Sequence, residues 1–122
     1  MDKVIFFIDD DKMILNLMQY TFSNRDNCKV FAFSKGEDCL PFLDKNPNIV
    51  VIDHSFVNNS IFNTGLEIID KIRETYAGAS FIVLTGSNDS AIRKQYEQRG
   101  VTSFINKDSF FIDILIEKIA CI

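Results

Sequence analysis

The most informative segment of the sequence is Val4-Ile5-Phe6-Phe7-Ile8-Asp9-Asp10-Asp11. Residues 4–8 are apolar without interruption, which is typical of a strand buried on both faces of a parallel sheet. Three consecutive carboxylates follow that strand directly. Apolar residues at helical spacing come next, at Ile14, Leu17, Met18 and Phe22. The chain therefore begins as a strand, an acidic turn and a helix.

The same alternation continues to the end of the chain. Further apolar runs predict strands over residues 29–33, 49–52, 81–84 and 102–106. Helical spacing predicts helices over residues 14–22, 34–43, 64–78, 88–99 and 109–121. Residues 54–63, rich in Asn and Ser, are expected to form a loop.

Local signals mark where the predicted helices begin and end. Two pairs have the spacing of a capping box, Ser34 with Glu37 and Thr64 with Glu67. We expect Ser87 or Asn88 to cap the fourth helix. Gly78 and Gly100 are expected to end the third and fourth helices.

Five strand–helix pairs predict the α/β fold class. Crossovers of this length join parallel strands, and their right-handedness places helices on both faces of the sheet. The 122 residues fall below the roughly 150 typical of one domain. We therefore expect one domain over residues 1–122, a doubly wound (βα)5 chain with a five-stranded parallel sheet of the flavodoxin-like type.

Composition excludes several classes of function. Thirteen basic and 17 acidic residues give a net charge of −4, which argues against direct nucleic-acid binding. Apolar runs of four to five residues are far shorter than the roughly 20 that a membrane span needs. The start of the chain does not resemble a signal peptide, so a cytoplasmic protein is expected. The three cysteines fit neither a disulfide framework nor a zinc site, and we expect free, buried thiols.

Polar residues stand at the predicted strand ends, which converge at one edge of such a sheet. The first strand ends in Asp9, Asp10 and Asp11, and the third ends in Asp53. Thr85 and Lys107 end the fourth and fifth strands. Adjacent carboxylates repel, and Mg²⁺ with oxygen ligands relieves that repulsion. Asp11 is expected to be a helix cap, and His54, the one histidine, an exposed loop residue.

In this order and spacing, the residues resemble the receiver domains of two-component response regulators, the CheY-like family, over essentially the whole chain. The resemblance rests on the strand before Asp9-Asp10, the strand before Asp53, Leu84-Thr85-Gly86, and the segment from Gly100 through Phe104 to Lys107. It implies a signalling domain that is not an enzyme in the usual sense but catalyses its own phosphorylation and dephosphorylation. A histidine kinase or a phosphotransfer protein would supply the phosphoryl group, and a downstream effector protein would respond.

The resemblance also implies individual roles. Asp53 would accept the phosphoryl group, which Lys107 and Thr85 would contact. Mg²⁺ would bind directly to Asp10, Asp53 and the Ser55 backbone carbonyl, and to Asp9 through a water molecule. Phe104 falls where the family carries its switching aromatic residue.

Three departures from the usual family pattern stand beside the site. The family has Met-Pro three and four positions after the phosphoacceptor, where this chain has Phe56-Val57. The family also has a Gly eight positions after the phosphoacceptor. Here the corresponding Gly65 lies twelve positions after Asp53, so the loop between them is about four residues longer. The family places Pro after the lysine, whereas Asp108 stands here, and the cost of a cis bond before a non-proline predicts a trans Lys107–Asp108 bond.

Other functions remain open at this point. A haloacid-dehalogenase-like enzyme also has an aspartate after its first strand, but Met13 stands where that motif needs Thr or Val. A degenerate receiver would bind partners without phosphorylation. The longer loop and Asp108 favour this alternative, and the intact set of Asp10, Asp53, Thr85 and Lys107 argues against it. Ile61 and Phe62 in that loop either pack onto the domain or contact a partner.

The last helix has two apolar faces. Its broad face is expected in the core and comprises Phe111, Ile112, Leu115, Ile116 and Ile119. Phe110, Ile114 and Cys121 form a second band on the opposite side, either exposed by chance or part of an interface. By resemblance, receiver domains often dimerise on this side, so we expect a weak homodimer, strengthened by phosphorylation, with Phe110 and Ile114 in contact.

Overall fold

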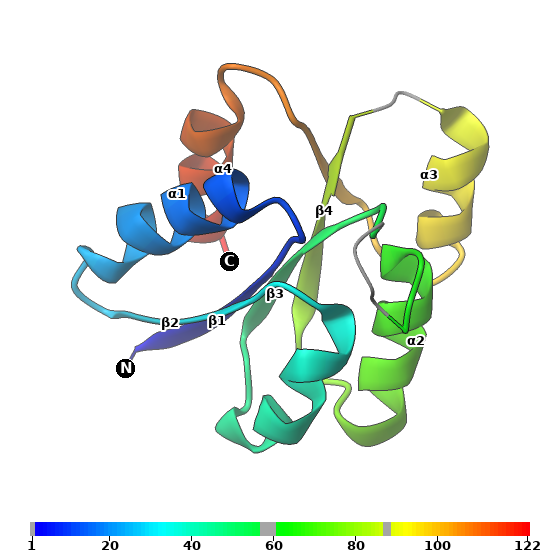
Figure 1. The fold of residues 1–122 in the computed structure, drawn as a ribbon, viewed down its shortest axis with the longest axis horizontal. Coiled ribbons are helices and arrows are strands. Elements are labelled where there is room, and N and C mark those ends of the chain that lie inside the picture. The colour runs from blue at the N-terminus through cyan, green and yellow to red at the C-terminus, as the bar shows by residue number, and fades with distance from the viewer. Residues whose placement is uncertain (1, 57–60, 87–88) are drawn as a thin grey trace.

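The structure is a computed structural model that describes residues 2–56, 61–86 and 89–122. Five parallel strands form one sheet in the order β2-β1-β3-β4-β5 (Figure 1). The strands are β1 (Lys3–Ile8), β2 (Cys28–Phe33), β3 (Ile49–Asp53), β4 (Ser80–Thr85) and β5 (Ser103–Asn106). The helices are α1 (Lys12–Ser23), the 3₁₀ helix η1 (Gly36–Lys45), α2 (Gly65–Thr75), α3 (Ser90–Glu97) and α4 (Phe111–Ala120). The predicted α/β class and five-stranded parallel sheet are confirmed.

Helices cover both faces of the sheet, as the crossover rule requires. Figure 1 shows α1 and α4 together on one face, and α2 and α3 on the other. Alternate residues of β1 enter the two cores: Phe6 and Ile8 pack under α2 and η1, while Ile5 and Phe7 pack under α1 and α4. All four are fully buried, which is why the strand reads as a continuous apolar run.

Strand register brings the polar strand ends to one edge. Ile8 lies opposite Ile52, Asp53 opposite Leu84, and Thr85 opposite Asn106. The residues that follow β1, β3, β4 and β5 therefore emerge side by side. The site is built at this edge.

Two helix starts illustrate how the sequence sets the elements. Asp11 caps α1, and its carboxylate accepts hydrogen bonds from the backbone N–H groups of Met13 and Ile14, as expected. Asp89 caps α3 in the same way, so the cap expected at Ser87 or Asn88 is wrong; those two residues lie outside the described part of the chain.

Both predicted capping boxes are wrong as hydrogen-bond arrangements. The caps of η1 and α2 are Lys35 and Thr64, and neither makes a side-chain capping bond. The Glu67 carboxylate instead accepts from the Asn63 N–H, one residue before the cap, at 3.4 Å. The Glu37 carboxylate accepts from the Ile61 N–H at 3.2 Å. N–H groups of the longer loop therefore bind the two carboxylates that would otherwise complete the capping boxes.

The predicted element ends shift for identifiable reasons. The segment at 36–45 is 3₁₀ rather than α-helical and contains Pro41, which has no backbone N–H to donate. Helix α2 ends at Thr75, not at Gly78, because Tyr76 is already extended. A Cβ at Gly78 would lie 2.7 Å from the Tyr76 hydroxyl oxygen, so Gly78 gives room to that ring. Gly100 has a φ of +76° just after α3, as a helix-ending glycine should.

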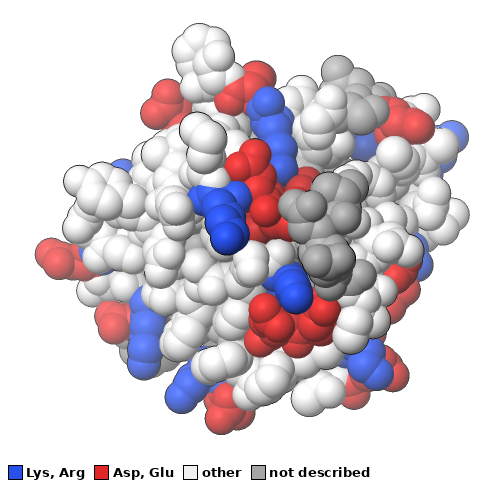
Figure 2. All heavy atoms as spheres, viewed as in Figure 1, with Lys and Arg blue, Asp and Glu red and all other residues white. Residues whose placement is uncertain are grey.

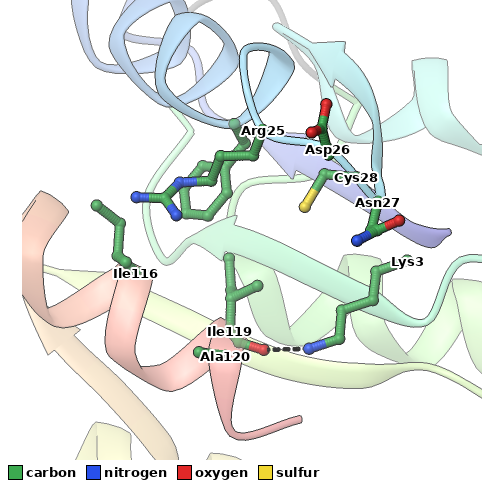
Figure 3. Close-up of a pocket in the computed structure, with 9 residues that line it drawn as sticks. Lys3, Arg25, Asp26, Asn27, Cys28, Ile116, Ile119 and Ala120 are labelled. Atoms are coloured by element: carbon green, nitrogen blue, oxygen red, sulfur yellow. Dashed lines mark hydrogen bonds between the residues drawn. The ribbon is translucent and has the colours of Figure 1, made fainter.

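The amphipathic character of α4 is confirmed. Phe111, Leu115 and Ile119 are buried, while Phe110 is 67% exposed and Ile114 is 37% exposed. The end of α4 is tied to the sheet, since the Lys3 ammonium donates a 2.7 Å hydrogen bond to the Ile119 carbonyl. Figure 3 shows this contact beside a hollow of about 400 Å³ between α4 and the turn after α1.

The cysteines depart from the expectation of three buried thiols. Only Cys39 is buried, which raises its pKa to about 12, whereas Cys28 is half-buried and Cys121 exposed. Among the residues described, no helix is both long and apolar enough to span a bilayer.

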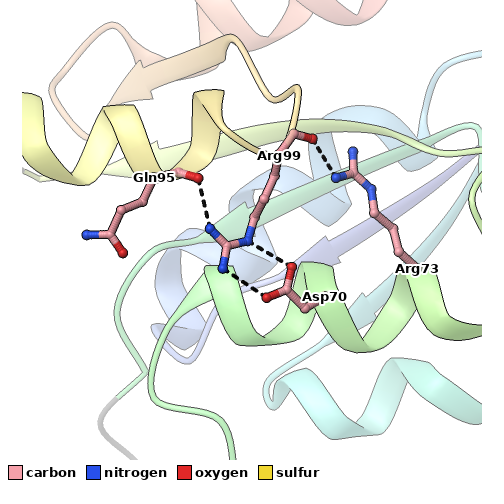
Figure 4. Close-up of polar contacts among 4 residues, drawn as sticks. All are labelled: Asp70, Arg73, Gln95 and Arg99. Carbon is pink, nitrogen blue, oxygen red and sulfur yellow. Dashed lines mark hydrogen bonds and ion pairs between the residues drawn. The ribbon is translucent and has the colours of Figure 1, made fainter.

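A polar clamp joins α2 to the end of α3 (Figure 4). The Arg99 guanidinium donates two hydrogen bonds to the Asp70 carboxylate, at 2.8 and 2.9 Å, and a third to the Gln95 carbonyl. Arg73 of α2 in turn donates to the Arg99 carbonyl. Bidentate geometry gives this partly exposed pair more weight than an ordinary surface ion pair.

Candidate functional site

Three carboxylates gather where β1 and β3 end. Asp9, Asp10 and Asp53 each place an oxygen within 4.8 Å of the others. Asp9 is fully buried and Asp53 is 7% exposed, while Asp10 is half-buried. Figure 2 shows acidic side chains, with basic ones beside them, near the middle of the face where these strands end. The predicted acidic cluster is confirmed as a geometric arrangement.

Lys107 reaches across to two of these carboxylates. Its Nζ lies 2.9 Å from Asp9 Oδ2 and 3.1 Å from Asp53 Oδ2. The Lys107 backbone N–H donates to the Thr85 carbonyl at 3.0 Å, which continues the β4–β5 pairing by one step. The Lys107–Asp108 bond is trans, as predicted. The lysine reaches the site without the proline typical of the family.

Burial and mutual repulsion govern the charges here. Burial, followed by the charge of Asp9, raises the pKa of Asp53 to about 6, although Lys107 acts in the opposite direction. Burial likewise raises the pKa of Asp9. For Lys107, burial lowers the pKa, but its hydrogen bond to Asp9 and the nearby carboxylate charges outweigh that effect and leave it raised. The Asp53 carboxyl group is therefore ionised at neutral pH, although the folded protein disfavours its charged form.

The donor set fits a hard divalent cation. Within the described residues, the buried Asp9 Oδ2 lies 2.9 Å from the Lys107 ammonium, which Asp9 shares with Asp53. One lysine balances part of the charge of three carboxylates. Oxygen ligands in such an excess are those that Mg²⁺ takes in proteins.

A cavity of about 430 Å³ opens beside Asp53, next to the acidic cluster. Thr85, which is 5% exposed, lines the cavity together with Gly86 and with Lys107, the residue that follows β5. The remaining lining residues are His54, Ser55 and Ile92. The predicted residues of β3, β4 and β5 therefore share one cavity.

The loop after Asp53 is paired at its base. The Gly65 N–H donates to the His54 carbonyl at 2.9 Å, and the Phe56 N–H donates to the Asn63 carbonyl at 3.0 Å. Ser55 faces Thr64 between these two bonds as an antiparallel bridge. The expected loop over 54–63 is thus a paired segment in its described part, and residues 57–60 lie outside that part. Ser55 is exposed at the rim of the cavity.

Of the two apolar loop residues, one packs and one does not. Phe62 packs against the core cluster under α2, 3.5 Å from the position a Cβ would take on Gly36. Ile61 is 74% exposed.

The expectation that His54 is an exposed loop residue is wrong. Its ring is half-buried, with Nδ1 2.6 Å from the hydroxyl oxygen of Tyr96 on α3. Burial lowers the pKa of His54, partly opposed by the charge of Asp89. Sequence reasoning missed Tyr96 because it was one apolar position among several on its helix. A fully buried phenol needs a hydrogen-bond partner, and that requirement was the available signal.

Phe104 lies beside the site, on β5. Its ring is half-buried, edge-to-face with Tyr96 at 5.9 Å between centroids. The Arg93 guanidinium lies 4.9 Å from the Phe104 ring centroid. Two residues of α3 therefore contact Phe104.

Comparisons with known proteins point to one family. The sequence profile described as Response regulator receiver domain matches residues 5–120. No curated protein matches the chain. The BeF3-activated DrrB receiver domain is 27% identical, with a TM-score of 0.78, over 99% of this chain and 97% of that one.

Two further solved structures share the fold. A CheY-like response regulator receiver domain protein from Methanospirillum hungatei is 22% identical, with a TM-score of 0.80, over 98% of this chain and 92% of that one. A response regulator protein from Burkholderia pseudomallei, solved with a phosphorylated aspartic acid and a calcium ion, is 21% identical. Its TM-score is 0.77, over 93% of this chain and 65% of that one.

Proposed function

The chain belongs to the response regulator receiver domains of two-component signalling, and from this premise we propose that Asp53 accepts a phosphoryl group. The observation that carries the proposal is the position of the Lys107 ammonium, 2.9 Å from Asp9 and 3.1 Å from Asp53. A lysine placed between two buried carboxylates at the mouth of a cavity can neutralise an incoming phosphoryl oxygen. A purely structural ion pair would not need a 430 Å³ cavity beside it.

The donor is a phosphohistidine on a histidine kinase or a phosphotransfer protein. An Asp53 carboxylate oxygen attacks phosphorus in line, and the bond between phosphorus and the histidine nitrogen breaks, leaving its electron pair on that nitrogen. The product is an aspartyl phosphate. Attack of water on phosphorus later breaks the bond to Asp53 and releases inorganic phosphate, with the carboxylate restored.

The chain's own residues prepare this transfer. Burial leaves the Asp53 carboxylate poorly solvated, and repulsion from Asp9 further disfavours its charge, so the carboxylate is a reactive nucleophile. Lys107 stabilises charge on the transferring oxygens, and the Thr85 hydroxyl donates a directional hydrogen bond to one of them. Asp10, Asp53 and the Ser55 carbonyl would hold Mg²⁺ directly, and Asp9 would hold it through water. When bound, Mg²⁺ neutralises phosphoryl charge.

The output is a change of protein contacts. Thr85 moves toward the phosphoryl group, and Phe104 repacks beside it. These movements change the surface formed by β5, α3 and α4, which we call the output surface, and so change its binding to an effector protein. The exposed Phe110 and Ile114 on α4 are proposed to join two copies of the chain in a weak homodimer that phosphorylation strengthens.

A small phosphodonor tests the proposal. The chain is treated with acetyl phosphate and Mg²⁺, and its intact mass is measured. Wild type should gain one phosphoryl group, and Asp53→Asn should gain none. Asp108→Asn, which keeps the residue after Lys107 similar in shape, serves as the matched control and should be modified as wild type is. A wild type that gains nothing would support a module that binds partners without phosphorylation.

A further inference from the structure

The hydroxyl group of Tyr96 lies at the base of the paired segment that follows Asp53. Tyr96 is on α3 and is fully buried. Its hydroxyl oxygen is 2.6 Å from His54 Nδ1, and the two rings meet edge-to-face at 5.5 Å. His54 directly follows Asp53 in the chain. A side chain of α3 therefore holds the residue next to the phosphoacceptor.

Gly65 leaves the space that this arrangement needs. A Cβ on Gly65 would lie 2.7 Å from the Tyr96 hydroxyl oxygen and 2.9 Å from the Asp53 carbonyl oxygen. Both separations are shorter than real Cβ contacts. Glycine at the first position of α2 is thus a condition for the hydroxyl to reach His54.

The hydroxyl group has a defined partner in His54. Its oxygen and His54 Nδ1 share a hydrogen bond, in which the tautomer of the His54 ring sets the donor. Burial, and then the charge of Asp53, raise the pKa of Tyr96, while the charge of Arg99 and the Leu66 backbone N–H act in the opposite sense. The contact between the two side chains is available to either neutral tautomer of His54.

The Tyr96 ring also contacts the predicted switch residue. The Phe104 ring lies edge-to-face with it at 5.9 Å. Tyr96 consequently contacts both His54, next to the phosphoacceptor, and Phe104 on β5. This connection runs through α3 and does not pass through Thr85.

Neither Asp53 nor α3 depends on the hydroxyl for its place in the fold. Asp53 pairs with Leu84 within the sheet, and the His54 N–H donates to the Leu84 carbonyl at 3.0 Å. The end of α3 is held on α2 by the Asp70–Arg99 clamp (Figure 4). Removing the hydroxyl should leave the nucleophile in position and change only the connection to α3.

We propose that Tyr96 is a positioning residue that couples the phosphoacceptor segment to α3 and β5, through its hydroxyl on His54 and its ring on Phe104. The inference rests on the proposed function, because it supposes an event at Asp53 to transmit. It adds a second connection between the site and the output surface.

Amide chemical shifts recorded with and without Mg²⁺ and beryllofluoride test the coupling. In wild type, the addition should shift Thr85 and Lys107 at the site and also Lys94 and Phe104 on the output side. In Tyr96→Phe, the shifts at Thr85 and Lys107 should persist, while those at Lys94 and Phe104 fall at least twofold. Acetyl phosphate should still modify this variant.

Two further variants make the result specific. Tyr76→Phe removes the hydroxyl group of a partly buried tyrosine that directly follows α2, at the end of that helix remote from Gly65, and should behave as wild type. His54→Ala should reduce the shifts at Lys94 and Phe104 as Tyr96→Phe does, and the double variant of His54 and Tyr96 should lose no more than either single variant.

The outcomes separate the two proposals. A wild type that acquires no phosphoryl group would remove the proposed function. A wild type that acquires it, together with full output-side shifts in Tyr96→Phe or additive losses in the double variant, would overturn the coupling role alone. If Tyr96→Phe fails to fold, full output-side shifts in His54→Ala would overturn it equally.

Discussion

Replacement of Asp53 by Asn should stabilise the protein at neutral pH, although it removes the proposed nucleophile. Burial and the neighbouring Asp9 charge raise the pKa of Asp53 from its ordinary 3.8 to about 6. At about 1.4 kcal/mol per pKa unit, ionising Asp53 in the folded state costs up to about 3 kcal/mol of unfolding free energy. Asn keeps the shape of the carboxyl group without its charge. We expect a gain of about 1–3 kcal/mol at pH 7, since the exchange also takes one carboxylate from Lys107.

The pH dependence gives the sign of this effect. A carboxyl group whose pKa is higher in the folded than in the unfolded state binds its proton more tightly when folded. The stability it confers is therefore present below about pH 4 and is lost as the pH rises through about 6. The stability difference between Asp53→Asn and wild type should be close to zero near pH 4 and reach its full value by pH 7.

Urea unfolding followed by far-ultraviolet circular dichroism, with a chelator present, measures the difference. Asp70→Asn is the matched control. The exposed Asp70 carboxylate has a pKa lowered by its hydrogen bond to Arg99, so its ionised form stabilises the folded state. The Asp70→Asn substitution should therefore destabilise the protein at pH 7, by less than about 1 kcal/mol. An Asp53→Asn variant that is no more stable than wild type at pH 7, or whose advantage does not change with pH, would refute this electrostatic account of the site.

Three further perturbations address the metal, the switch and the interface. Asp10→Asn should weaken Mg²⁺ or Mn²⁺ binding roughly tenfold or more by removing a direct ligand, and a titration identical to that of wild type would contradict the ligand assignment. Thr85→Ala should keep phosphorylation by acetyl phosphate to a greater extent than it keeps the beryllofluoride-induced shift at Phe104; equal losses of both would argue against its switching role. Ile114→Glu should leave the fold intact and move a beryllofluoride-treated sample toward monomer in sedimentation velocity, whereas a wild type that is already monomeric would end the homodimer proposal.

The strands and the site edge could be predicted because they depend on local patterns. An apolar run such as residues 4–8 has one stable place in an α/β fold, between two helical layers. Once the strands are parallel, Asp9, Asp53 and Lys107 must emerge at the same edge. The close approach of Lys107 to both carboxylates follows from this geometry and from the pairing of β5 with β4.

Several of the errors arose where a residue outside a local motif binds one of its groups. Glu37 and Glu67 have capping-box spacing, but their carboxylates bind the N–H groups of Ile61 and Asn63 in the longer loop. His54 follows a strand, as an exposed loop residue would, yet its ring forms a hydrogen bond with the hydroxyl group of Tyr96, 42 positions away in the chain. The pairings of Glu37 with Ile61 and of His54 with Tyr96, 24 and 42 positions apart, are set by tertiary packing, and local spacing does not encode them.

Trapping of the aspartyl phosphate tests whether Asp53 is the residue that accepts the phosphoryl group. The chain is treated with acetyl phosphate and Mg²⁺, the acyl phosphate is reduced with borohydride, and the modified residue is located by peptide mass spectrometry. Reduction of an aspartyl phosphate converts that aspartate to homoserine. The account predicts homoserine at position 53 and unmodified aspartates at positions 9 and 10. Modification at Asp9 or Asp10 in place of Asp53, or no modification of the chain, would contradict it.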